Sequence, residues 1–515
     1  MKKRPGRKSK KNFQSKNVIL VILLACVTIF TILIIGNRSI FTPHAETITG
    51  TQYYVDSVGG SDTNTGTSES AAWKSLDKVT SSSFAAGDVV NFKRGSTWNT
   101  TLTIASNGSN GSPVTYQAYG TGTAPTIDTS ANDGIDISGN YNVVKDFLIK
   151  NVSHYGVNIT GAHNTVSDNE FANVGSGIWI AGGNNLITRN NAHNLKMINN
   201  TPGGDDDYGA TGYIINSANN EISYNTCTDC TAPSYDYGSD GGFVEVWQVG
   251  DNSYIHNNHA VNTNGFFELG GDNSGTANGI KIQYNIIDST GSLLCAHTSG
   301  GFAIPTSNVT IDNNTVINSA GIVCDMPSGL SLRNNIFYGD SPSGSGFTHT
   351  NNLYSSQPGY SLGSGEKVGN PLFVNASGGD YHLQAGSPAI DAGANLGFTR
   401  DFENGTVPVG SAPDIGAYEY GSTPQSSPAP NPSTAPSVAV TTIIPSYDCV
   451  GGVNCGPSSN PTNASPSNSP STVVSQVPLT QAPPTSPGRG GNSFIGFILL
   501  LFQLILQFLR ALIGR

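Results

Sequence analysis

Two segments of the chain combine carboxylates with tyrosines. The first, residues 200–213, reads NTPGGDDDYGATGY and the second, residues 229–241, reads DCTAPSYDYGSDG, in a chain of which only 11% of residues are charged. Carboxylate oxygens are the ligands that Ca²⁺ prefers, and tyrosines offer both a stacking ring and a hydroxyl. The sequence therefore predicts a Ca²⁺ site at Asp205, Asp206 and Asp207, and substrate-binding roles for Tyr208, Tyr235, Asp236, Tyr237 and Asp240. The alternative is a solvated loop or a purely structural ion.

A pair of glutamates follows at equivalent positions in two similar segments. Glu245 in GFVEV and Glu268 in GFFEL each stand three residues after a glycine. If these segments are successive coils of a repeat, the carboxylates become neighbours, and their repulsion requires a proton or a cation. Such pairs are typical of functional sites, so both are candidate catalytic residues. The alternative is a pair of solvated glutamates on an outer surface.

Three functions fit these residues. In the first, carboxylate-bound Ca²⁺ neutralises a uronate of a polysaccharide while Lys196 removes the adjacent proton, which is a lyase-type elimination. In the second, Glu245 and Glu268 act as the carboxylate pair of a glycoside hydrolase. In the third, the protein binds a glycan without cleaving it, as an adhesin does.

Three further residues are candidates for contacting a substrate. Tryptophan rings offer flat apolar faces for a sugar ring, and an arginine on the strand before the first acidic segment is the other nearby basic group. These residues are Trp179, Trp247 and Arg189. No ligand spacing links the histidines of the same region to a partner, so we expect no site role for His256, His259 and His297.

The elements that would position these residues are short strands separated by turns. An aliphatic residue followed three positions later by asparagine recurs, at intervals of 21 to 35 residues. These asparagines are Asn169, Asn190, Asn225, Asn258, Asn285, Asn314 and Asn335. Variable intervals around one unit indicate a solenoid whose coils carry loops of different length. Because stacked coils place equal residues about 4.8 Å apart, we expect a hydrogen-bonded asparagine column.

Glycine followed by alternating apolar residues defines a second strand in each coil. This pattern begins at Gly134, Gly156, Gly177, Gly212, Gly242, Gly265 and Gly321. The two longest intervals between the asparagines, 35 and 33 residues, contain the two acidic segments. Each insertion lies between an asparagine and the next glycine of adjacent coils. We therefore expect loops 197–211 and 229–241 to project side by side, over Glu245 and Glu268.

The ends of this repetitive region resemble a known family. The opening motifs YYVDSVGGSDTNTGT, AAWKSL, GDVVNFKRGSTW and SPVTYQAYG, and the closing motifs GNPLFVN, GDYHLQAGSPAIDAG and DIGAYEY, are similar to those of bacterial right-handed parallel β-helix proteins. The resemblance covers nearly all of residues 52–421 and implies an all-β, right-handed parallel β-helix. That family includes polysaccharide lyases, glycoside hydrolases, uronan epimerases and proteins of no known activity, so the resemblance implies a polysaccharide partner without choosing a reaction.

Six cysteines form three local pairs in the sequence. They are Cys227 and Cys230, Cys295 and Cys324, and Cys449 and Cys455. In an exported protein such pairs predict disulfides before they predict metal ligands. Cys295 and Cys324 follow the glutamates in the glycine register, so we expect both to continue the glutamate column and to bond across adjacent coils.

Composition separates the remaining parts of the chain. Residues 46–421 contain 12 Lys/Arg and 34 Asp/Glu, a net formal charge of −22, which argues against a nucleic-acid partner. Residues 1–17 predict a basic cytoplasmic head, and 18–36 predict a transmembrane signal-anchor, with a cleaved signal peptide as the alternative. Residues 422–490 predict a disordered Pro/Ser/Thr-rich linker. Residues 491–515 predict a membrane-associated helix, lying in the interface or packed on a partner helix. We expect location in the cell membrane with the β-helix domain, 46–421, extracellular.

Overall fold

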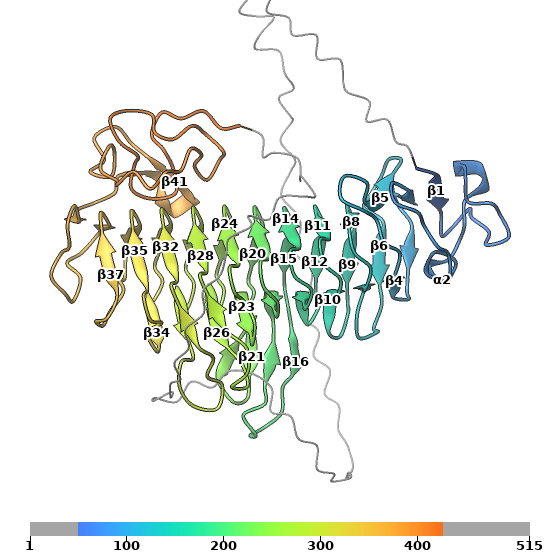
Figure 1. Ribbon diagram of the computed structural model, residues 1–515, viewed down its shortest axis with the longest axis horizontal. Coiled ribbons are helices and arrows are strands. Elements are labelled where there is room, and N and C mark those ends of the chain that lie inside the picture. Colours follow the sequence, from blue (N-terminus) through green and yellow to red (C-terminus); the bar gives the residue numbers. More distant parts are fainter. Residues whose placement is uncertain (1–49, 426–515) are drawn as a thin grey trace, which may run out of the picture. The chain divides into compact units, whose positions relative to one another are not determined.

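The computed structural model describes residues 50–425, which form stacked coils of parallel β-strands. Within this range the coils build three long sheets of 12, 12 and 9 strands, here called sheets A, B and C (Figure 1). Neighbouring strands of one sheet come from successive coils and are parallel. The all-β parallel β-helix that the repeats predict is therefore confirmed.

The strands are short and evenly distributed over the coils. Sheet A contains β1 (Gln52–Val55), β2 (Val89–Lys93), β5 (Val114–Tyr119), β8 (Asn142–Lys145), β11 (Thr165–Ser167), β14 (Leu186–Thr188), β19 (Glu221–Ser223), β24 (Tyr254–His256), β28 (Lys281–Gln283), β32 (Thr310–Asp312), β35 (Ser331–Arg333) and β37 (Thr348–Thr350). Sheet B contains β3 (Thr97–Trp98), β6 (Thr126–Asp128), β9 (Leu148–Lys150), β12 (Glu170–Ala172), β15 (Asn191–His193), β20 (Thr226–Thr228), β25 (His259–Val261), β29 (Ile286–Asp288), β33 (Thr315–Ile317), β36 (Ile336–Tyr338), β38 (Leu353–Tyr354) and β39 (Lys367–Val368). Sheet C contains β4 (Leu102–Ile104), β7 (Ile135–Ile137), β10 (Tyr155–Ile159), β13 (Ser176–Ile180), β18 (Thr211–Ile215), β23 (Gly242–Trp247), β26 (Phe267–Gly270), β30 (Leu294–Ala296) and β34 (Ile322–Cys324).

Smaller elements complete the described residues. Paired short strands are β16 (Met197–Asn199) with β17 (Tyr208–Gly209), β21 (Ala232–Ser234) with β22 (Gly238–Asp240), β27 (Ala277–Asn278) with β31 (Thr306–Ser307), and β40 (Phe373–Asn375) with β41 (Asp380–Leu383). The helical turns are η1 (Glu69–Ala71), α2 (Leu76–Thr80) and η2 (Ala376–Gly378).

Each coil contains one more strand than the repeats revealed. Sheet A strands precede the column asparagines and sheet C strands follow the repeated glycines, as expected, but sheet B lies between them. Strands such as β20, with the sequence TCT, bury only their central residue and show no apolar alternation. The prediction of two strand columns was therefore incomplete, because a three-residue strand is too short to show a period of apolar residues in the sequence.

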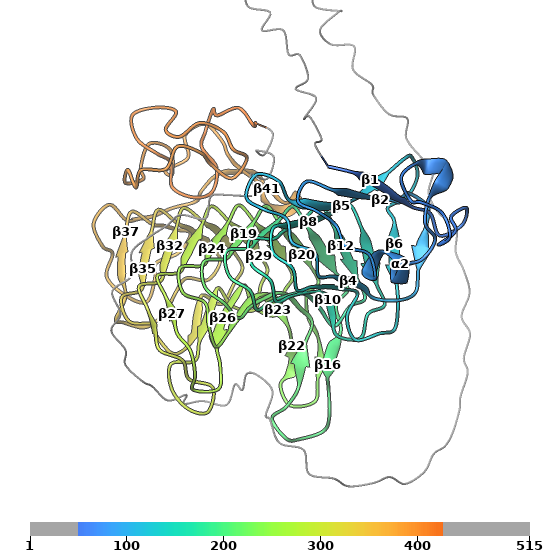
Figure 2. The ribbon, with the colours of Figure 1, turned by 45° about the vertical axis from the view of Figure 1, so that its right-hand side comes forward.

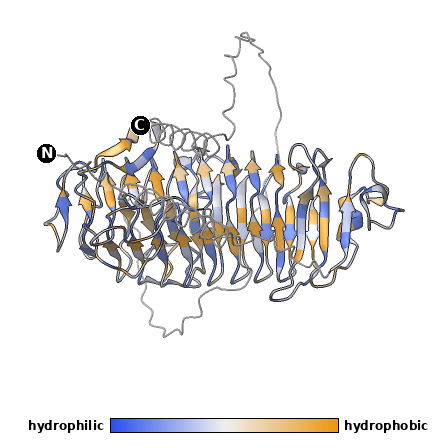
Figure 3. Ribbon diagram, turned by 90° about the horizontal axis from the view of Figure 1, so that it is seen from above, coloured by the Kyte–Doolittle hydropathy of each residue, from blue (hydrophilic) through white to orange (hydrophobic). Residues whose placement is uncertain are grey.

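Columns of aliphatic side chains form the core of the coils. The central residues of successive sheet A strands are fully buried: Val144, Val166, Ile187, Ile222, Ile255, Ile282, Ile311 and Leu332. Hydrophobic and hydrophilic residues alternate along the strands (Figure 3), since successive side chains of a strand point to opposite faces. Burial of each such side chain contributes about 1.5–3 kcal/mol, so the coils need no separate core.

The predicted asparagine column is confirmed as a hydrogen-bonded ladder at the turn between sheets A and B. The side-chain amide of Asn169 donates to the Asn190 side chain at 3.0 Å, and the same bond continues coil by coil to Asn352. The residue before each ladder asparagine has a positive φ, as in Asp168 and Arg189. This left-handed residue turns the chain sharply from one sheet to the next, and the buried amide satisfies the turn's polar groups.

Two of the predicted disulfides are confirmed. Cys227 is bonded to Cys230 within one coil, and Cys295 is bonded to Cys324 across two coils. In the strand register Cys295 lies beside Val323, so Cys324 stands one residue beyond the column position that was predicted for it. The pair Cys449 and Cys455 lies outside the described residues.

The two ends of the coil stack differ from its middle. Helix α2 buries Leu76 and Val79 against the first coils. After β41 the chain folds back along the turn between sheets A and B, where the Asn257 amide donates to the Asp401 carbonyl at 2.9 Å. In this terminal segment buried carboxylates accept backbone N–H groups in place of regular strands, as Asp401 does from Gly405 at 2.7 Å.

Within residues 50–425, no helix is long and apolar enough to cross a membrane. The predicted head (1–17), anchor (18–36) and membrane-associated helix (491–515) lie outside the described residues, as does most of the predicted linker (422–490).

Candidate functional site

One column of outward-facing residues runs along sheet C. Strand pairing places these side chains in register, coil after coil: Asp136, Asn158, Trp179, Ile214, Glu245, Glu268, Cys295 and Val323. The prediction that Glu245 and Glu268 are neighbours on adjacent coils is confirmed. Both side chains are partly buried, so neither is a fully solvated surface glutamate.

Two β-hairpins project side by side from the turn between sheets B and C. The first is built by β16 and β17 and the second by β21 and β22, on successive coils (Figures 1 and 2). The amide of Asn200 on the first hairpin donates to the Pro233 carbonyl on the second at 2.9 Å. The two acidic segments therefore lie together on one side of the coils, as their positions in the repeat predict.

The carboxylates of the hairpin tips hold the two hairpins to each other. Asp207 is fully buried and accepts hydrogen bonds from the Thr201 N–H at 2.6 Å, the Ser234 hydroxyl at 2.7 Å and the Asp236 N–H at 3.0 Å. Although burial opposes ionisation, these donors hold the pKa of Asp207 below its ordinary value. Asp236 in turn accepts the Gly203 N–H at 3.0 Å.

Three hairpin carboxylates are also close enough to share a cation. One oxygen each from Asp206, Asp207 and Asp236 lies within 4.8 Å of the others. Asp205, the third member of the predicted Ca²⁺ site, instead accepts a hydrogen bond from the Tyr237 hydroxyl at 2.8 Å. The donor set is the oxygen-only kind that suits Ca²⁺, but five of its six oxygens already accept hydrogen bonds within the hairpins.

A pocket lies between the base of the second hairpin and the end of the sheet C column. Its volume is about 300 Å³. Residues that line it include Tyr237, Asp240, Asn264, Glu268, Ser292 and Cys295. It therefore combines a catalytic candidate, Glu268, with two residues predicted to bind substrate, Tyr237 and Asp240.

Protons are held unusually strongly around this pocket. Burial, together with the charges of Glu268 and Asp240, raises the pKa of Glu245 well above its ordinary value. Burial and the charge of Glu268 raise the pKa of Asp240 to about 7, although the Gly241 N–H donates to its carboxylate. The arrangement thus favours the protonated form of Glu245 beside Glu268.

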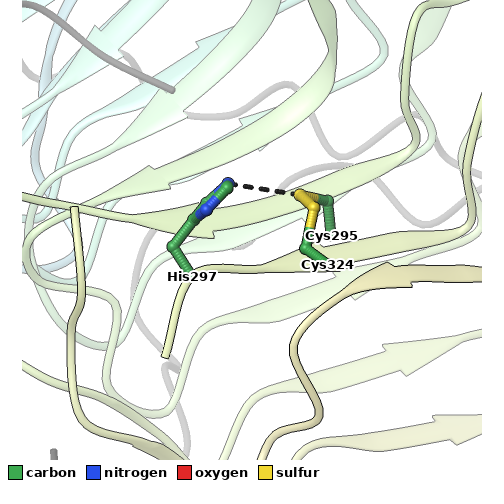
Figure 4. Close-up of side chains that lie close together, drawn as sticks. All are labelled: Cys295, His297 and Cys324. Atoms are coloured by element: carbon green, nitrogen blue, oxygen red, sulfur yellow. Dashed lines mark hydrogen bonds between the residues drawn. A yellow bond between two sulfur atoms is a disulfide. The ribbon is translucent and has the colours of Figure 1, made fainter. Parts of the chain in front are cut away.

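A buried histidine on the neighbouring coil meets Glu268. Nε2 of His297, a fully buried residue, lies 3.2 Å from Oε1 of Glu268 and 3.2 Å from Sγ of Cys295. Figure 4 shows the ring against the Cys295–Cys324 disulfide. Residue spacing named no partner for His297, whereas the structure places it against Glu268 and Cys295. Its place two residues after a column residue, hence on the same strand face, was the available signal.

A second polar cluster surrounds Asp136, which lies four coils from Glu245 on the same column. The Asn158 amide lies 3.2 Å from Asp133 and 3.3 Å from Asp136. Burial and the charge of Asp133 raise the pKa of Asp136 to about 6. The pKa of Asp133 is lowered instead, because hydrogen bonds from neighbours including His154 outweigh the effect of burial. Sequence reasoning missed this cluster because isolated polar residues in separate coils form no local motif.

The aromatic candidates occupy different positions along sheet C. Trp179 stacks on Tyr155 with ring centroids 5.3 Å apart, and the Tyr208 hydroxyl lies 3.4 Å from His154. Trp247 is mostly buried, and its ring centroid lies 6.3 Å from that of Phe302. Tyr235, at the tip of the second hairpin, is 68% exposed.

The two basic candidates do not line the pocket. Lys196 stands at the base of the first hairpin, where its carbonyl accepts the Ala210 N–H at 2.9 Å and burial lowers the pKa of its amine. Arg189 lies at the turn between sheets A and B, paired through two hydrogen bonds of 2.7 and 2.8 Å with Asp168. The structure thus places Arg189 away from the sheet C column, because its left-handed backbone ends the sheet A strand.

Comparisons with known proteins identify the fold. A family model described as a right handed beta helix region matches residues 133–304. A lacto-N-biosidase of Bifidobacterium longum subsp. longum is 46% identical over 78 residues, which are 14% of this chain and 5% of that protein, so the chain spans a small part of this relative. The crystal structure of the pectate lyase Pel9A is similar with a TM-score of 0.53 at 18% identity, covering 72% of this chain and 98% of that one. A lacto-N-biosidase structure from Eubacterium ramulus has a TM-score of 0.33 at 14% identity, covering 58% and 67%. The chain thus contains a right-handed parallel β-helix similar to that of a polysaccharide lyase.

Proposed function

We propose that this protein binds a polysaccharide on sheet C and hydrolyses it with Glu245 and Glu268. The observation that supports this most directly is the in-register pairing of two carboxyl groups, one of which, Glu245, has its pKa raised well above the ordinary value by burial. A glycoside hydrolase needs one carboxylic acid and one carboxylate on either side of the scissile bond. Burial favours the carboxylic acid at Glu245, and the contact with His297 favours the carboxylate at Glu268.

The roles follow from these environments. Glu245 donates its proton to the glycosidic oxygen as the bond to the anomeric carbon breaks. Glu268 attacks that carbon and forms a glycosyl ester, and Glu245 then takes a proton from the water that releases the sugar. Adjacent strands are about 4.8 Å apart, which is close to the carboxyl separation of about 5–5.5 Å in retaining enzymes. The proposed reaction therefore retains the anomeric configuration.

A lyase is the second candidate function, and specific observations support it. Burial lowers the pKa of Lys196, which makes its amine a better base at neutral pH. Ca²⁺ bound by the clustered oxygens of Asp206, Asp207 and Asp236 would supply the positive charge that a uronate needs in an acidic environment. The lyase requires the substrate to reach the first hairpin, whereas the hydrolase requires it at the pocket.

The two functions are separated by their products and by their variants. The full-length protein is incubated with polygalacturonate, alginate, xylan, mannan and galactan, and both new reducing ends and ultraviolet absorbance of unsaturated ends are followed. The proposed hydrolase gives reducing ends without unsaturation, and Glu245→Gln or Glu268→Gln lowers kcat about 100-fold or more. Unsaturated ends that disappear in Lys196→Ala would establish the lyase instead. Glycan binding without either product would identify a non-catalytic binder.

A matched control is available on another face of the same coils. Glu221 on sheet A also contacts a histidine, with Nε2 of His256 at 3.1 Å from its carboxylate, but it does not line the pocket. Glu221→Gln therefore tests whether loss of any histidine-paired glutamate lowers activity through stability alone. We expect it to leave kcat within about twofold of the unchanged protein.

A further inference from the structure

We propose that the binding face extends from the pocket over the stacked rings of Tyr155 and Trp179 to Asn158 and Asp136, and that its ligand is the interior of a neutral polysaccharide. This inference rests on the proposed function and adds the substrate class and the mode of cleavage. A chain bound across the whole face is cut internally, whereas a pocket alone would take only a chain end.

The first support is the register of the column. Asp136 and Glu245 occupy the same outward position four coils apart, which corresponds to ~19 Å at ~4.8 Å for each coil. Trp179 lies halfway between them. A linear glycan running along the coil stack would therefore pass over all three residues before reaching Glu268.

The second support is the aromatic pair in the middle of this path. Trp179 is partly exposed, and its ring stacks on Tyr155 with an interplanar angle of 20°. The stack fixes the indole in one orientation on the outer face of the sheet. A flat, immobilised ring at such a position suits the apolar face of a sugar and loses little entropy on binding.

The third support is that the first hairpin borders the same path. Tyr208 at its base lies with its hydroxyl 3.4 Å from Nε2 of His154, which stands next to Tyr155. Burial, followed by the charges of Tyr208 and Glu245, raises the pKa of the Tyr155 phenol. The first hairpin thus flanks the aromatic pair as the second flanks the pocket.

The charge of this face selects the ligand. Within residues 50–425, the column residues and the residues that line the pocket include no Lys or Arg, but they do include Asp136, Asp240, Glu245 and Glu268. A polyuronate would meet carboxylates without a matching cation. A neutral chain would instead find carboxylate and amide groups that accept and donate hydrogen bonds to its hydroxyls, as Asn158 and Asp136 can.

The test measures how activity depends on chain length. Oligosaccharides of increasing length are prepared from the neutral polymer of the panel that the full-length protein cleaves, and kcat/KM is determined for each. We expect kcat/KM to rise with length in the unchanged protein. Trp179→Ala should lower it about tenfold for long chains and less than twofold for the shortest cleaved one, because only long chains reach this ring. Trp179→Phe should recover most of the kcat/KM that Trp179→Ala loses on long chains, which distinguishes a loss of ring stacking from a folding defect.

Tyr254→Ala provides the control, since Tyr254 is an outward aromatic on sheet A that stacks on His256 at 4.0 Å. Size analysis of early products should show internal fragments. An equal effect of Trp179→Ala at every length, or release of end units alone by the unchanged protein, would overturn the extended face while leaving the hydrolase intact. Failure of the unchanged protein to bind or cleave any glycan would overturn both proposals, and cleavage confined to polyuronates would overturn the neutral ligand.

Discussion

Nε2 of His297 lies 3.2 Å from Oε1 of Glu268, and Glu268 pairs in register with Glu245 on the next strand of sheet C. A fully buried ring thus holds a carboxylate at the edge of a pocket. Similar contacts join His256 to Glu221 on sheet A, but there no second carboxyl group is paired in register. The difference makes the sheet C pair suited to acid–base chemistry.

Replacement of His297 should alter the pH dependence of activity. In His297→Asn the carboxylate of Glu268 loses its contact with Nε2, so we expect kcat to fall about tenfold and the acidic limb of the kcat profile to move to higher pH. KM should change little, since His297 is buried and does not line the pocket. His256→Asn is the matched control, and an unshifted profile in His297→Asn would assign the ring a structural role alone.

Asp240 should make the folded state less stable as the pH rises. Its pKa of about 7 lies above the ordinary value of 3.8, so the folded state binds a proton that the unfolded state has released. The contribution to stability is therefore greatest below about pH 4 and is lost progressively toward pH 7. We expect Asp240→Asn to raise Tm at pH 7.5 but not at pH 4, measured by thermal unfolding. The exposed Asp272, replaced by Asn, is the control; equal shifts at both pH values would contradict the explanation.

The two disulfides should contribute unequally to stability. Cys295 and Cys324 are 29 residues apart in the chain, whereas Cys227 and Cys230 are 3 apart. Loop-closure entropy then predicts losses of about 3.6 and about 1.6 kcal/mol when each pair is replaced by serine. Denaturant unfolding measures both. Activity should fall only when Cys295 and Cys324 are replaced, because Cys295 borders the pocket and His297. Loss of activity only when Cys227 and Cys230 are replaced would argue against an active site at this pocket.

Removal of divalent cations should leave the proposed hydrolase active. Asp207 accepts three hydrogen bonds from the hairpins, which hold them together without an ion. We therefore expect EDTA to change kcat less than twofold. Asp207→Asn should instead loosen the hairpins and increase their cleavage by a protease, with Asp272→Asn as the surface control. Loss of activity in EDTA that Ca²⁺ restores would support the lyase.

The parts of the site that repeat were predictable from the sequence. The asparagine ladder, the neighbouring positions of Glu245 and Glu268, and the shared side of the two hairpins all follow from counting along coils. This works because a solenoid converts sequence intervals into vertical neighbours through one fixed strand spacing. The same counting assigned Cys324 to the column position that Val323 occupies, because the last coil of sheet C departs from the register.

Contacts made across a coil or around a turn were decided by the tertiary structure alone. His297 reaches Glu268 from a neighbouring coil, Arg189 pairs with Asp168 at a distant turn, and Asp207 bonds within the hairpins. The sequence determined the fold, the stacking of the two glutamates and the position of the acidic loops. The tertiary structure decided which carboxylates are buried and which accept hydrogen bonds. Protonation depends on those surroundings, which residue spacing does not encode.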